Sequence, residues 1–258
     1  MMFGLSELLW LLILMGPLLF LQNRLHYEVQ AILLLLTRRT DITAILFFIL
    51  FFPGILLHEI SHLIIAFLLR VRVGSISLLP RVIEPSGTGK PPHLQLGRVE
   101  TSSTDIFRDA FIGAAPLFTG GLLITYGGMI QLHLGQVWES MVKGDINKLF
   151  IDITSLYTLP DFWVWFYLIL VVSSTMLPSA SDRRAWLPIS LIFISLITIS
   201  LLAGAGPWMA SHLAPVLVQA FQALTLVVGI SVSSHLILLV PLYLLRRILT
   251  RLTGLQVG

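Results

Sequence analysis

The sequence predicts an all-α polytopic membrane protein with about six transmembrane helices and a small membrane-associated β-hairpin region after the second. Hydrophobic residues make up 56% of the 258 residues and charged residues only 11%, whereas a soluble domain carries roughly 25% charged residues. The mean hydropathy is +0.93, and the apolar residues gather in long runs, which favours helices over a barrel. The length suits a single membrane domain, residues 1–258.

The apolar runs set the order of the predicted spans. The six predicted spans are residues 5–22, 42–69, 106–131, 162–178, 186–203 and 213–245. Residues 29–36 are too short to cross a bilayer alone, so they either lie at the membrane interface or lengthen a neighbouring helix. Residues 132–160 form a polar connection. Residues 70–105 are rich in Gly and Pro and hold two β-like pieces around a turn, which predicts a β-like loop on the cytoplasmic side.

The basic residues indicate the orientation of the chain. If the N-terminus is cytoplasmic, most of the 16 Lys and Arg residues fall on the cytoplasmic side, as the positive-inside rule requires. Both termini are then cytoplasmic, and the expected location is the plasma membrane of a prokaryote. The net charge of +3 does not indicate a nucleic-acid partner, because the basic residues lie beside apolar runs. The lipid bilayer is the expected surrounding.

The second predicted span contains a metal-binding motif. His58-Glu59-Ile60-Ser61-His62 reads H-E-x-x-H, and on a helix its two histidines share one face, one turn apart. Both imidazoles can therefore reach one cation, and Glu59 can take a proton from a water molecule that the cation activates. Ionisable groups inside a membrane span cost roughly 2.5–3.5 kcal/mol each, which a bound ion would offset. Histidines satisfied by neighbouring helices are the alternative.

A third metal ligand is expected on the same side of the membrane. A catalytic zinc site usually has three protein ligands and one open position. The chain has no cysteine, so His, Asp and Glu are the available ligands. Asp182 is the leading candidate, because Pro178 should break the fourth span and let the chain turn back into the bundle. The alternative is that Asp182 pairs with an arginine: Arg108, Arg183 or Arg184. The competing acidic residues are Glu84, Glu100, Asp105 and Asp109.

Together these features resemble the site-2 protease family of intramembrane zinc metalloproteases. They are the motif on a transmembrane helix, the β-like loop after it, the small-residue segment Gly113-Ala114-Ala115-Pro116, and an Asp after a later span. The resemblance covers roughly residues 42–185, the metalloprotease core. It implies one zinc ion per chain, Glu59 as general base, and endopeptidase activity on transmembrane segments of membrane-protein substrates near the cytoplasmic face. The implied metal ligands are His58, His62 and Asp182.

The resemblance also implies where a substrate would bind. The stretch 71–100 is similar to the hairpins that steer substrate in that family, and its loop should bring His93 near the site. Where the family commonly has Asn before the ligating Asp, this chain has Ser174 or Thr175, whose hydroxyl would hydrogen-bond substrate. The alternative is a hydroxyl that bonds back to its own helix. Pro116 belongs to the segment that stands beside the active site in the family.

Other functions can use the same residues. A different class of membrane zinc protease takes a Glu as third ligand from a separate helix. A membrane transporter of metal ions or protons, or a scaffold without catalytic activity, can be built on the same intramembrane His and Glu cluster. His235, inside the last predicted span, is expected to hydrogen-bond a neighbouring helix, with a functional role as the alternative.

Overall fold

The fold is helical, and four of its helices are long and apolar enough to cross a membrane. The computed structural model describes the backbone of residues 2–77, 81–83, 93–95, 98–101 and 104–255, and the side chains of residues 6–74 and 104–255. The four long candidates are Ser6–Thr37, Thr40–Leu68, Ile106–Gln131 and Gly206–Thr253. The prediction of an all-α membrane protein is therefore confirmed in its coarse form. Six spans are not confirmed, because two of the apolar helices are shorter.

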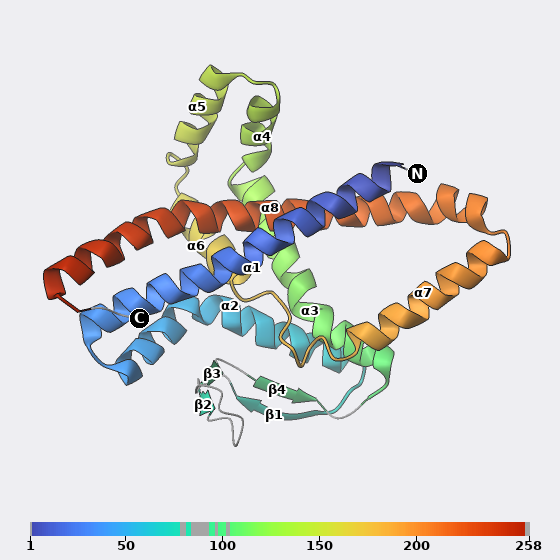
Figure 1. Ribbon diagram of the computed structural model, residues 1–258, viewed down its shortest axis with the longest axis horizontal. Helices are drawn as coiled ribbons and strands as arrows, with labels where there is room; N and C mark the ends of the chain where they lie inside the picture. Colours follow the sequence, from blue (N-terminus) through green and yellow to red (C-terminus); the bar gives the residue numbers. More distant parts are fainter. Residues whose placement is uncertain (1, 78–80, 84–92, 96–97, 102–103, 256–258) are drawn as a thin grey trace.

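The long helices follow the apolar runs but extend beyond them (Figure 1). Helix α1 covers Met2–Thr37 and α2 covers Thr40–Leu68. Residues 29–36 thus lengthen the first helix, one of the two alternatives that their length left open. The chain reverses within Arg38 and Arg39, and Arg38 takes the positive φ of 55° that so abrupt a turn requires.

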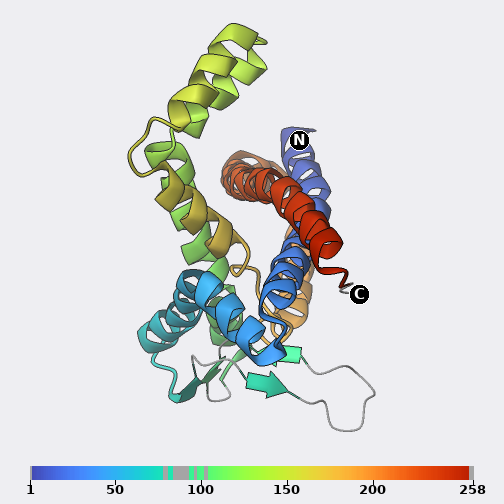
Figure 2. The same cartoon turned by 90° about the vertical axis from the view of Figure 1, so that its left-hand side faces the viewer.

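Helix α3, Ile106–Thr125, continues as one π-helical segment, η1, Tyr126–Gln131. The polar connection that follows folds into two short helices, α4 (Leu134–Val142) and α5 (Ile146–Leu156). These two helices project from one end of the body, opposite the strands (Figures 1 and 2).

The two short apolar helices are α6, Phe162–Ser173, and α7, Trp186–Leu202. No residue of α7 is buried. Helix α8, Gly206–Thr253, is the longest element. At 1.5 Å per residue it measures about 72 Å, more than twice the roughly 30 Å hydrocarbon core, so it must tilt strongly or extend beyond the bilayer. Together α7 and the first part of α8 extend away from the body (Figure 1).

Helices α1 and α8 run parallel along each other (Figure 1). Near the start of α1, Glu7 accepts a hydrogen bond from Gln222, and towards its end Glu28 accepts one from Arg246. The contacts follow the same order along both helices, which defines a parallel pair. Six spans of alternating direction would make the first and the last antiparallel. The arrangement therefore does not fit that topology if both helices cross the membrane.

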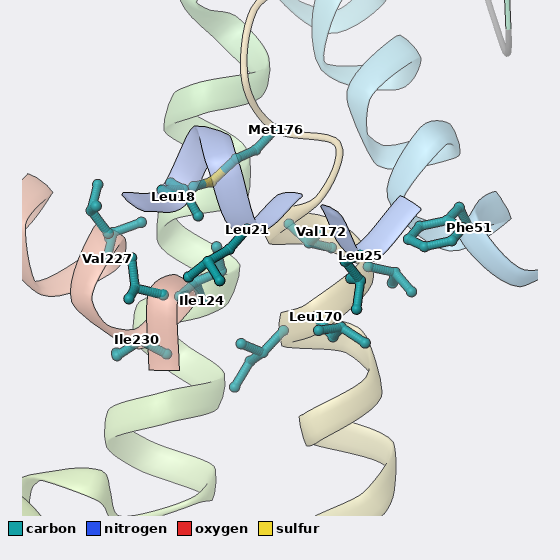
Figure 3. Close-up of a cluster of buried hydrophobic side chains, with 14 of the residues drawn as sticks. Leu18, Leu21, Leu25, Phe51, Ile124, Leu170, Val172, Met176, Val227 and Ile230 are labelled. Carbon is teal, nitrogen blue, oxygen red and sulfur yellow. The ribbon is translucent and has the colours of Figure 1, made fainter. Parts of the chain in front are cut away.

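The core is formed mainly by buried residues of α1, α2, α3, α6 and α8 (Figure 3). Leu18, Leu21 and Leu25 of α1 form one stripe, since residues three and four apart share a helix face. The residues that face this stripe come from the other four helices and from the chain just after α6: Phe51, Ile124, Leu170, Val172, Met176, Val227 and Ile230. The core therefore fixes α6 against α2 and α3, the three elements around the predicted site.

Four short strands follow α2. Strand β1, Val73–Ser77, pairs with β4, Arg98–Thr101, and β2, Arg81–Ile83, pairs with β3, His93–Gln95, both antiparallel. The predicted turn, residues 86–92, lies outside the described residues, so the β-hairpin is not confirmed. The strands lie beneath α2 in Figure 1.

The parallel arrangement can be tested with single cysteines, because the chain has none of its own. If α1 and α8 both cross the membrane, cysteines at the exposed positions Thr40 and Leu255 should react with an impermeant maleimide from the same face. A cysteine at Ser211, near the start of α8, should react from the opposite face. Labelling of Thr40→Cys and Leu255→Cys from opposite faces would instead fit six alternating spans.

Candidate metal centre

Three predicted ligands lie together in the structure. His58 and His62 come from one face of α2, and Asp182 comes from the connection between α6 and α7. The two Nε2 atoms are 3.1 Å apart. Asp182 Oδ2 lies 3.8 Å from His58 Nε2, and Asp182 Oδ1 lies 3.6 Å from His62 Nε2. With one ligand atom taken from each residue, all three atoms lie within 4.8 Å of one another.

These separations fit a small cation. A tetrahedral zinc ion with bonds of 2.0–2.1 Å to nitrogen and oxygen spaces its ligands about 3.3 Å apart. The nitrogen pair is slightly closer than this value, and each ring has a different carboxylate oxygen 3.6–3.8 Å away. With a single carboxylate oxygen the three atoms spread over as much as 4.8 Å, so a bound ion would draw the carboxylate closer. Two imidazoles and one carboxylate leave the fourth tetrahedral position for another group, as in a catalytic zinc site rather than a closed structural one.

The hydrogen bonds of the rings fix which nitrogen faces the centre. His58 Nδ1 lies 2.7 Å from the carbonyl oxygen of Thr175, and His62 Nδ1 lies 2.8 Å from that of Ile112. A carbonyl accepts but cannot donate, so each neutral ring carries its proton on Nδ1 and a lone pair on Nε2. The two Nε2 lone pairs then face each other without a proton between them. A metal ion satisfies both, and carbonyl partners of this kind are usual behind metal-bound histidines.

The Asp182 carboxylate is oriented by its own turn. Ser179 N–H donates to Asp182 Oδ2 at 2.7 Å, and Asp182 N–H donates to Ser179 Oγ at 3.3 Å. This reciprocal pair has the form of a capping box, with Ser and an acid three residues apart. Burial alone would raise the pKa of Asp182, and the hydrogen bond that it accepts from the Ser179 N–H acts in the opposite direction and lowers it. The group is therefore an anion at neutral pH.

The arginines that compete for Asp182 have other partners. Their partners are Asp105 for Arg108, Asp109 for Arg184 and the carbonyl of Ser179 for Arg183. The ion pair between Arg184 and Asp109, at 2.8 Å, ties the connection after α6 to the start of α3. Asp105 and Asp109, two alternatives to Asp182 as the third ligand, are therefore held in ion pairs with arginines. The other two, Glu84 and Glu100, have side chains outside the described part of the chain.

Two glycines allow the ligand-bearing segments to approach. A Cβ atom at Gly54 would overlap the Val171 carbonyl and the Thr175 hydroxyl, and one at Gly113 would overlap the Asp182 carbonyl. Gly54 lies one turn before His58, so it brings the end of α6 against the ring-bearing face of α2. Gly113 brings the Asp182 turn against α3. The sequence marked Gly113 only as part of a small-residue segment, and Gly54 carried no signal beyond its place beside Pro53.

The other predicted site residues come from separate elements and differ in their surroundings. Glu59 is buried, with 8% of its surface exposed, and it lies one residue after His58 on the same helix. Pro116 is buried within α3. The Thr175 hydroxyl bonds back to Val171 O at 2.9 Å, the alternative expected for such a group. His93 lies in β3, and its side chain is outside the described part.

Ser174 belongs to a buried polar contact between three helices. Its hydroxyl lies 3.0 Å from His235 Nε2 of α8, and its carbonyl accepts a hydrogen bond from Gln22 of α1 at 2.6 Å. His235 thus bonds a neighbouring helix, as expected from its place within an apolar run. These bonds hold Ser174 in place. Ser174 is adjacent to Thr175, whose carbonyl oxygen accepts from His58 Nδ1. Gln22, which bonds Ser174, was not among the predicted site residues. Its polar side chain within the apolar run 5–22 could have pointed to a buried hydrogen bond.

Comparisons with models of protein families, with curated proteins and with solved structures found no match to this chain.

The contact at Gly113 predicts the effect of one added methyl group. Gly113→Ala should push the Asp182 turn away from the rings, because overpacking costs typically ~1–3 kcal/mol and the turn is the element that can yield. We expect zinc affinity, measured by competition with a chromophoric chelator, to fall about tenfold or more. Gly229→Ala in α8 is the matched control, since a Cβ there meets nothing within 4 Å. Equal affinities of the two variants would contradict the packing argument.

Proposed function

We propose that this protein is an intramembrane zinc metalloendopeptidase of the site-2 protease type. Its substrates would be membrane proteins, cut in or near a transmembrane segment. The observation that carries the proposal is the convergence of two Nε2 lone pairs and one carboxylate at a single point. The resemblance of residues 42–185 to that family adds the reaction type. Burial of Glu59 beside the first histidine supports its role as the general base.

Each residue of the centre has a defined task in the proposed reaction. His58, His62 and Asp182 would hold the ion. Zinc, when bound, would act as a Lewis acid that polarises the peptide carbonyl and lowers the pKa of a water ligand towards roughly 7. Glu59 would accept the proton of the attacking water and pass it to the leaving amine. A carboxylate can perform both transfers because it becomes an acid once it has accepted the proton.

The membrane position of the centre belongs to the same proposal. His62 lies eight residues before Arg70, which corresponds to a depth of roughly 12 Å along the helix. The proposed site opens near the cytoplasmic face of a prokaryotic plasma membrane, with the strand region beside it. The placement of both termini in the cytoplasm requires that either α1 or α8 does not cross, because the two helices run parallel.

Substrate binding would involve groups around the centre. Ser174 is engaged with His235, and the Thr175 hydroxyl bonds its own helix. Either group would therefore have to exchange a hydrogen bond in order to hold a substrate. Pro116 is buried within α3, and His93 belongs to the proposed substrate-steering strands. Pairing of a substrate with an edge strand would expose carbonyls that a helical substrate hides.

Replacement of the acidic residues separates metal binding from catalysis. Glu59→Gln should retain zinc and lose about 10²–10⁴-fold in cleavage rate, since it removes the base and leaves the ligands intact. Asp182→Ala should lose both zinc and cleavage. Metal content of the purified variants, together with new protein termini found by mass spectrometry after co-reconstitution with total membrane proteins, checks both outcomes.

The controls for this experiment are exposed acids of the same type: Glu139→Gln and Asp161→Ala. Both should retain zinc and cleavage. Retention of zinc by Asp182→Ala would favour the class of protease with a Glu ligand from elsewhere. A transporter predicts zinc or proton flux across proteoliposomes that Glu59→Gln alters, with no new termini in any variant. That result would overturn the protease proposal.

Metal removal provides an independent test of the reaction class. A chelator that strips the ion should abolish cleavage, and added zinc should restore it, because the protein ligands alone supply no Lewis acid. The Glu59→Gln variant should remain inactive after the same treatment. Cleavage that persists in fully metal-free protein would exclude the proposed mechanism.

A further inference from the structure

The two carbonyls behind the histidines both lie where regular helix hydrogen bonding stops. In an α-helix each carbonyl accepts from the N–H four residues later. Ile112 lies inside α3, and the residue four positions on is Pro116. Proline has no N–H, so the Ile112 carbonyl lacks its regular helical partner. It accepts from His62 Nδ1 at 2.8 Å instead.

The Thr175 carbonyl is left free in a related way. Helix α6 ends at Ser173, and Pro178, three residues after Thr175, has no N–H for a tighter turn. The residue four positions on is Ser179, whose N–H donates to Asp182 Oδ2. His58 Nδ1 therefore takes the Thr175 carbonyl at 2.7 Å. The end of α6 therefore provides the Thr175 carbonyl as acceptor for His58 and the Ser179 N–H as donor to Asp182.

We propose that Pro116 and Pro178 are positioning residues: by freeing the carbonyls of Ile112 and Thr175, they hold His62 and His58 as Nδ1-protonated tautomers with both Nε2 lone pairs directed at the metal. The inference rests on the proposed zinc function only for the reason why the lone pairs should be oriented. Its physical content, the tautomer of each ring, does not need the metal.

A restored N–H at position 116 would compete with the ring. A carbonyl has two lone pairs, so the Ile112 oxygen in Pro116→Ala can accept from both the new backbone N–H and His62, but the shared bond is weaker and the straightened helix draws the oxygen towards its own axis. The ring then loses its preference for one tautomer. Loss of such a partner behind a metal ligand typically lowers metal affinity about 10–100-fold.

The test measures tautomers and metal affinity separately. Full-length protein labelled with ¹⁵N-histidine is reconstituted in lipid, and the imidazole nitrogens are observed by solid-state NMR without metal at about pH 8, above the usual histidine pKa. His58 and His62 signals are assigned by their loss in single Asn variants. Both wild-type rings should show a protonated Nδ1 and a bare Nε2. In Pro116→Ala, His62 should become a mixture while His58 stays unchanged, and Pro178→Ala should show the reverse.

Zinc affinity provides the second readout. Pro116→Ala should bind zinc about 10–100-fold more weakly than wild type. The matched control is Pro241→Ala, an exposed proline inside α8, which should change neither tautomers nor affinity. Circular dichroism and thermal unfolding show whether each variant folds.

The outcomes are distinguishable from failure of the proposed function. Wild-type rings protonated on Nε2 would overturn the inference, even if no proline variant folds. Unchanged His62 tautomer and affinity within threefold of wild type in folded Pro116→Ala would also overturn it. Correct tautomers in a wild-type protein that does not bind zinc would leave the positioning role standing and refute the zinc function.

Discussion

The lone pairs on His58 Nε2 and His62 Nε2 constrain everything around them. Two acceptor nitrogens 3.1 Å apart repel one another, and the Asp182 carboxylate beside them adds to the repulsion. Helices α2, α3 and α6 nevertheless meet at this point, each with a part in the cluster. Helix α2 carries the rings, α3 and the chain after α6 supply the carbonyls that hold them, and the connection before α7 carries the acid. A cation at its centre would relieve this repulsion, so the packing of the three elements and the binding of a cation would support each other.

The grouping of His58, His62 and Asp182 was predictable because it depends on local geometry. Histidines four residues apart share a helix face wherever the helix lies, and Pro178 marks a helix end that brings Asp182 back towards the bundle. The carbonyls of Ile112 and Thr175 could not be predicted, because every residue has a carbonyl and hydropathy does not reveal which one faces a ring. In retrospect the absent N–H at Pro116 was the available signal, but it has meaning only once α3 is known to lie against α2.

The membrane topology was harder to predict than the site. Counting basic residues assigns sides correctly only if every apolar run crosses the bilayer, and the runs at α6 and α7 form helices of 12 and 17 residues. Helix α1 ends at Thr37 and α2 begins at Thr40, so the chain reverses within two residues, and residues 29–36 belong to α1. The parallel packing of α1 on α8 follows from contacts distant in the chain, such as Glu28 with Arg246, which no local pattern encodes.

The three residues of the cluster are attached to the protein in different ways. Both rings are attached to the second half of α2, a long helix that packs in the core. Asp182 lies instead in an irregular connection, restrained by the Ser179 turn, the contact with Gly113 and the salt bridge from Arg184 to Asp109. Two members of the cluster therefore depend on a long helix and the third on a short irregular segment. A substitution between α6 and α7 can displace the carboxylate without moving either ring.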